Sequence, residues 1–65
     1  MSTETKMALG DLMRQLSATH ESLVRAEAEA LRLGDKEITD RVITLRTSTH
    51  ELHQELLAKV GHHGA

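Results

Sequence analysis

Histidine is the residue type in this chain best suited to chemistry, and His50 and His53 lie close together in the run His50-Glu51-Leu52-His53. The helix of a zinc protease carries two histidines at i and i+4 with a glutamate beside the first. Here the spacing is i and i+3, and no third ligand is evident. The sequence also has no glycine-rich phosphate loop and no Ser/His/Asp grouping. We therefore expect no catalytic residue, no cofactor and no small-molecule substrate.

The histidines leave two other interpretations open. His50 and His53 occupy neighbouring helical turns and could hold Zn²⁺ or Ni²⁺ together, while His62 and His63 could bind such ions adventitiously. Exposed or packed histidine is the commoner explanation, and four ligands cannot be counted, so no metal site is predicted. Alternatively, protonation of His20 and His53 near pH 6 could weaken assembly of the protein.

The elements that position these residues are two helices. Apolar residues recur at alternating gaps of three and four, which is typical of the a and d positions of a heptad. In the first half they are Leu9, Leu12, Leu16, Thr19, Leu23, Ala26, Ala30 and Leu33; in the second half they are Ile38, Val42, Leu45, Thr49, Leu52 and Leu56. The pattern predicts an all-α fold: an antiparallel two-helix hairpin with helices at about 4–33 and 36–60.

The two rows also predict a register for the hairpin. Because a positions face d positions in an antiparallel pair, the numbers of paired residues should sum to about 68. Thr19 and Thr49 then fall opposite each other, and Glu29 falls beside Arg41. Each threonine hydroxyl can either fix the register or bond back to its own helix, and the second is the usual behaviour. The predicted seam pairs are Leu12–Leu56, Leu16–Leu52, Leu23–Leu45, Ala26–Val42 and Ala30–Ile38.

Capping residues mark the ends of both helices. Thr3 or Thr5 is the expected N-cap of the first helix, Gly34 suits the left-handed position that ends it, and Asp35 suits the N-cap of the second. Gly61 is expected to stop the second helix. Residues 1–65 thus make one domain, with frayed tails at 1–4 and 61–65.

A second apolar surface beside the seam predicts assembly. Because a hairpin of 65 residues buries little core, covering this surface could contribute as much stability as a whole small domain has. We expect a homodimer, a four-helix bundle made from two hairpins. We call this surface the apolar flank; it occupies e and b positions and consists of Met13, Val24, Leu31, Ile43, Leu57 and Val60.

Composition excludes several classes of protein. The net charge is −2, so no global basic field favours nucleic acid, and there is no aromatic residue to stack on bases. No apolar run approaches the roughly 20 residues of a membrane span, and the N-terminus lacks the order of a signal peptide. There is no cysteine, which is compatible with a cytoplasmic location.

The second half of the chain resembles the Rop (repressor of primer) family of plasmid-encoded RNA-binding regulators of copy number. The resemblance covers residues 34–64 and includes Glu37, Asp40 and Leu45; its tail is carried by Glu51, Leu52, Leu57, Ala58, Lys59, Val60, Gly61 and Gly64. The resemblance implies a dimeric four-helix bundle. It transfers no RNA-binding residue, because the positions aligned with the family's basic and phenylalanine-centred face are Arg14, Ala18, Ser22 and Glu29.

The sequence therefore predicts a small non-enzymatic regulatory or adaptor protein that binds another protein through the apolar flank. The alternative is a Rop-like RNA-binding regulator that uses one side of the first helix, where Arg14, Arg25 and Arg32 could contact phosphates. A purely structural assembly unit is the third possibility.

Overall fold

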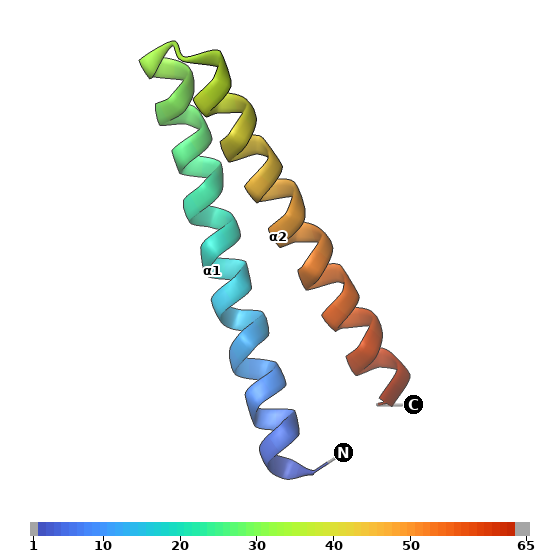
Figure 1. Ribbon diagram of the computed structural model, residues 1–65. Coiled ribbons are helices and arrows are strands. Elements are labelled where there is room, and N and C mark those ends of the chain that lie inside the picture. Colours follow the sequence, from blue (N-terminus) through green and yellow to red (C-terminus); the bar gives the residue numbers. More distant parts are fainter. Residues whose placement is uncertain (1, 64–65) are drawn as a thin grey trace.

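Two long helices lie side by side and run in opposite directions (Figure 1). The computed structural model describes residues 2–63, and the side chains of residues 2–60. Helix α1 spans Thr3–Leu33 and α2 spans Lys36–His63. Because the connection between them is short, the start of α1 and the end of α2 lie at the same end of the molecule. The predicted all-α hairpin is confirmed. Neither helix holds a stretch apolar and long enough to cross a lipid bilayer within the part of the chain that the structure describes.

The N-cap of the first helix lies one residue before Thr3 and three before Thr5, the two expected caps. Ser2 is the N-cap, in extended backbone conformation, and its Oγ accepts a hydrogen bond of 3.1 Å from the Thr5 backbone N–H. Thr3 is already helical, and the Thr5 hydroxyl instead lies 2.8 Å from the Ser2 hydroxyl. The prediction of Thr3 or Thr5 as N-cap was therefore wrong: the Ser2 hydroxyl reaches the exposed amide of the first turn, as a cap requires.

The turn between the helices has the predicted chemistry. Gly34 has φ +79°, and its N–H donates to the carbonyls of Ala30 and Leu31 at 3.2 and 3.1 Å. The Asp35 carboxylate accepts a 3.1 Å hydrogen bond from the N–H of Ile38. Both capping predictions are confirmed, and the chain reverses within two residues.

Helix α2 does not stop at Gly61. It continues to His63, so the predicted end near Val60 was one turn too early. A glycine costs a helix about 1 kcal/mol relative to alanine but does not by itself end it. Of the predicted tails, Thr3 and Glu4 are helical, whereas Met1 and residues 64–65 lie outside the described residues.

The helices pack through a seam that is rotated from the predicted one. Ala30 (6% exposed) and Leu56 (9%) are buried, as is Thr39, whose hydroxyl donates to the Asp35 carbonyl at 2.8 Å. Around them the a and e positions are half-buried, and most d positions are exposed, which corrects the predicted a/d seam. The half-buried residues are Leu9, Met13, Leu16, His20, Leu23, Ala26 and Glu27 in α1, and Val42, Ile43, Arg46, Thr49 and His53 in α2.

Two cross-helix contacts follow the rotated seam. Glu27 pairs with Arg46 and His20 lies against His50, and these contacts join e and b positions that the predicted a/d seam did not include. The predicted Glu29–Arg41 pair gives way to contacts within each helix. Glu29 binds Arg32 at 3.0 Å and Arg41 binds Glu37 at 3.4 Å, because residues three or four apart are neighbours on a helix surface.

The seam threonines take their ordinary role. The hydroxyls of Thr19 and Thr49 each donate to a carbonyl one turn earlier, those of Gln15 and Leu45, at 2.8 Å. Thr49 is half-buried, whereas Thr19 is exposed. The interpretation that each hydroxyl bonds back to its own helix is confirmed, and the two residues do not specify the register.

Candidate functional site

A row of d positions that should have filled the hairpin core faces solvent instead. Leu45 is 57% exposed, although the heptad pattern places it opposite Leu23. Ala26 alone in this row is half-buried. We call this surface the d row; it consists of Leu12, Thr19, Ala26 and Leu33 of α1 and Ile38, Leu45 and Leu52 of α2.

The six residues of the apolar flank divide into two groups. Met13 and Ile43 are half-buried against the opposite helix, so they belong to the hairpin seam. The other four remain exposed, and Leu31 is the most open at 62%. We call these four the outer flank; they are Val24, Leu31, Leu57 and Val60.

The d row and the outer flank lie on opposite sides of the hairpin. Successive residues of a helix are about 100° apart, so positions b and d lie on nearly opposite sides of the helix axis. The a and e positions, which form the seam, lie between them. In an antiparallel pair this geometry places the b positions of both helices on one face and the d positions on the other. The single layer of two helices therefore has an apolar row on each face.

The outer flank contains shallow hollows between the helices. One of about 330 Å³ is lined by Val24, Ala28 and Leu31 with the half-buried pair Glu27 and Arg46. A second, also of about 330 Å³, continues from Leu31 to the turn and Thr39. The two share Leu31, so this side offers a continuous depression along α1 that ends at the turn.

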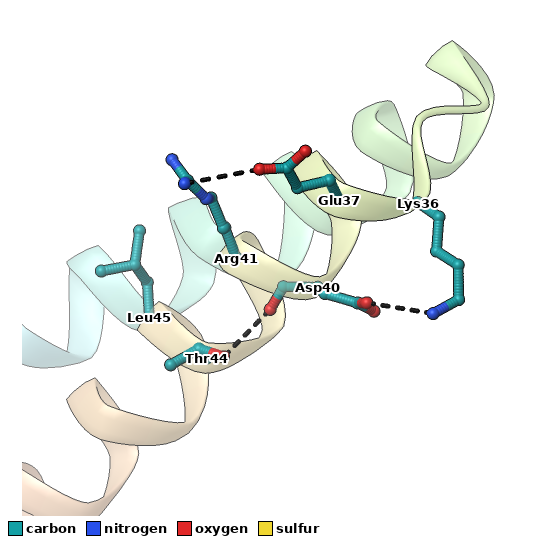
Figure 2. Close-up of a pocket in the computed structure, with 6 residues that line it drawn as sticks. All are labelled: Lys36, Glu37, Asp40, Arg41, Thr44 and Leu45. Carbon is teal, nitrogen blue, oxygen red and sulfur yellow. Dashed lines mark hydrogen bonds and ion pairs between the residues drawn. The ribbon is translucent and has the colours of Figure 1, made fainter.

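A wider hollow of about 720 Å³ lies on the outer side of α2 (Figure 2). All of its lining residues come from this one helix. They include two ion pairs, Lys36–Asp40 at 3.3 Å and Glu37–Arg41 at 3.4 Å, and Leu45 of the d row. Because no second element forms an opposing wall, this hollow cannot enclose a small molecule, and its apolar part is continuous with the d row.

One charged pair crosses between the helices near the outer flank. The Arg46 Nε donates to the Glu27 carboxylate at 2.6 Å, and both side chains are about one-third exposed or less. The pair neutralises two charges that would otherwise be costly in the seam. It also places a hydrogen-bonding group in the wall of the hollow that Val24, Ala28 and Leu31 line.

The arginines of the alternative RNA-binding side do not form a free basic stripe. Arg14 is ion-paired with Asp11, and Arg32 with Glu29. These side chains are exposed, as is Arg25. Carboxylates one turn away therefore weaken the positive field that phosphate binding requires.

The structure places the histidines differently from the flank position that the sequence suggested for His20 and His53. His20 and His53 are half-buried in the seam rather than on the flank, and the ring of exposed His50 lies against His20, with centroids 5.5 Å apart. Among the described residues no group of three or more His, Cys, Asp or Glu side chains is placed to hold a metal ion. The structure thus joins His50 to His20 across the helices, a pairing that the His50–His53 spacing did not suggest.

Sequence reasoning missed two features here, the exposed d row and the His20–His50 contact. The signal for the exposed d row was the set of e positions, where Met13, His20 and Glu27 in α1 can meet Arg46 and His53 in α2. His50 is a b position, so this set did not indicate its contact with His20. A carboxylate on one helix and a guanidinium on the other can pair across the seam between two helices.

Comparison with models of known families, with curated proteins and with solved structures found no match.

Proposed function

We propose that this chain is a non-enzymatic regulatory or adaptor protein that forms a homodimer through its d row and binds a protein partner through its outer flank. The observation that carries this proposal is the pair of apolar rows on opposite faces of a single helical layer. A dimer that covers one row leaves the other open, so the two surfaces can serve two different contacts.

The exposed area supports association with a second copy of the chain. The chain exposes 5055 Å² of accessible surface, about 900 Å² more than the roughly 4100 Å² typical of a folded monomer of 7.2 kDa. A stable interface of standard size buries about 800 Å² on each partner. Association of two hairpins would therefore return the exposed surface per chain to the ordinary range.

The burial of individual residues supports the same arrangement. No large side chain is fully buried among the residues that the structure describes. Covering a half-exposed leucine contributes about 1 kcal/mol, and the d row offers five large aliphatic side chains per chain. A two-fold axis would stack the two d rows, so that a and d positions together line the centre of a four-helix bundle.

The outer flank is the better candidate for a different partner. It has fewer large aliphatic residues, and the Glu27–Arg46 pair lies at its edge. An amphipathic helix fits such a surface, because its apolar residues can fill the depression beside Leu31 while its polar edge reaches the charged pair. Interfaces of this kind regulate or connect other proteins without chemistry.

Matched substitutions on the two faces test the assignment. Leu45 and Leu31 are exposed to similar extents, so aspartate at either position should leave the isolated hairpin intact. In a dimer through the d row, Leu45→Asp buries two unpaired carboxylates and should weaken association at least about 100-fold. Leu31→Asp should leave association unchanged. Sedimentation equilibrium measures both; a Leu45→Asp variant that remains dimeric, or a wild-type monomer, contradicts the proposal.

A pull-down from the native host separates a protein partner from RNA. The wild-type chain should capture a protein that resists nuclease treatment and is lost with Leu31→Asp. An Arg14→Glu, Arg25→Glu double variant should retain that protein. Loss of all bound material after nuclease treatment, or with the arginine variant alone, would favour the RNA-binding alternative. Binding should then also weaken steeply between about 50 and 200 mM salt.

A further inference from the structure

We propose that His20 and His50 form a two-ligand site for a divalent transition-metal ion, with Zn²⁺ as the ordinary occupant, that cross-links α1 to α2. This site is independent of the proposed dimer and of its partner. It rests on one geometric fact: two imidazole rings that are thirty residues apart in sequence meet across the hairpin, with centroids 5.5 Å apart and planes tilted by 45°.

The separation of the rings suits a shared metal ion. Zinc binds an imidazole nitrogen at about 2.1 Å in tetrahedral geometry, which places the centroids of two such rings about 5 Å apart. The observed separation of 5.5 Å is close to this value, so the distance between the two rings permits both to bind one ion. Imidazole is also a ligand that zinc, nickel and copper prefer over calcium or magnesium.

The surroundings permit a cation to bind. His50 is exposed and gives access from solvent, while His20 is half-buried and held in the seam. The nearest basic residue along α2, Arg46, is one turn before His50, and its guanidinium is already bound to the Glu27 carboxylate at 2.6 Å. Because no third ligand of the described residues completes the site, the remaining coordination positions would be filled by water.

The effect of the metal follows from where its two ligands lie. One ligand belongs to each helix, so an ion bound to the folded hairpin but not to the unfolded chain stabilises the folded state. The pair His50 and His53, on a single helix, would not cross-link the hairpin in this way. The bound ion would therefore cross-link the two helices near the middle of the hairpin.

Thermal unfolding followed by circular dichroism tests the site, with ZnCl₂ compared against EDTA. A His62→Ala, His63→Ala background removes the tail histidines from the measurement. Saturating zinc should raise Tm by about 5 °C or more, and the shift should persist on tenfold dilution because both ligands belong to one chain. His20→Ala and the milder His50→Gln should each abolish the shift. In EDTA, the His50→Gln variant should have the same Tm as the His62→Ala, His63→Ala background protein, because His50 is exposed.

His53→Ala is the matched control, because it removes a histidine of the same seam that is not paired with His20. It should keep the zinc-dependent shift. A shift that survives His20→Ala but is lost with His53→Ala would assign the ion to the i, i+3 pair of α2 and overturn the proposal. The absence of any zinc-dependent shift in the background protein would overturn it as well.

Discussion

At the scale of single residues, the contact that most directly fixes the seam is the Glu27–Arg46 pair. It is one of five ion pairs among the described residues, and the other four join residues of the same helix. Exposed pairs within a helix contribute little, typically a few tenths of a kcal/mol. A pair that is only about one-third exposed is screened less by water, so it can distinguish one register from another.

A double-mutant cycle on Glu27 and Arg46 should therefore give a coupling free energy of about 1 kcal/mol. The cycle uses Glu27→Gln, Arg46→Gln and the double variant, with unfolding by urea at one fixed protein concentration. The same cycle on Glu37 and Arg41, which are mostly exposed, should give about 0.3 kcal/mol or less. Equal coupling at the two pairs would mean that Glu27 and Arg46 do not meet across the seam.

At the scale of the helices, the sequence predicted nearly everything that depends on local chemistry. The left-handed Gly34, the Asp35 cap and the extents of both helices follow from conformational preference and from the periodicity of apolar residues. The two misplaced boundaries, at Ser2 and at Gly61, lie in terminal turns of the helices. More than one residue can cap such a turn, and the end of a helix can move by a residue or two.

The rotation of the seam could not be predicted in the same way. The d row is as apolar as the a row, so the heptad pattern alone cannot say which of the two faces the other helix and which faces another molecule. The deciding contacts, Glu27–Arg46 and His20–His50, involve polar residues that a search for apolar positions passes over. For the candidate site, four of the six residues of the apolar flank are exposed, whereas Met13 and Ile43 lie in the seam.

Two glycine-to-alanine substitutions should have opposite effects on the helices. Gly10 lies within α1 with open space where a Cβ would be added, so Gly10→Ala should stabilise the fold by about 1 kcal/mol. Gly34 also has open space around it, but its φ of +79° disfavours any side chain. Gly34→Ala should therefore destabilise by about 1–2 kcal/mol.

Urea unfolding of the two variants at matched concentration measures this difference. Because neither added methyl group meets a neighbouring atom, packing cannot explain why one substitution should stabilise the fold and the other destabilise it. Stabilisation by Gly34→Ala would show that the left-handed turn is not required for the hairpin.

At the scale of the whole molecule, the hairpin is a rod rather than a globule. Its principal extents are 47 × 16 × 12 Å, and its radius of gyration is 14.8 Å, against about 11 Å for a compact domain of 65 residues. Such a shape buries little apolar surface, so the hairpin alone should have low stability. Association should therefore add to its stability.

The melting temperature should accordingly rise with protein concentration. If folding and dimerisation are coupled, mass action shifts the equilibrium toward the folded dimer as the chain is concentrated. Between about 5 and 500 µM, the midpoint of thermal unfolding should increase by several degrees, followed by circular dichroism. The Leu45→Asp variant is the control, and its midpoint should not change with concentration. A wild-type midpoint that is equally constant would identify a self-sufficient monomer.

The two-residue reversal at Gly34 and Asp35 also disfavours an exchange of helices between copies. If the backbone straightened there into one continuous rod, the stripe that ends at Leu33 would run on into Glu37, Asp40, Thr44 and Thr47. The apolar residues of the second half would emerge on nearly the opposite side of that rod. A second straight helix could cover only one of these two apolar surfaces. Because the heptad pattern changes phase between the two halves of the chain, the folded-back hairpin is favoured over the continuous rod.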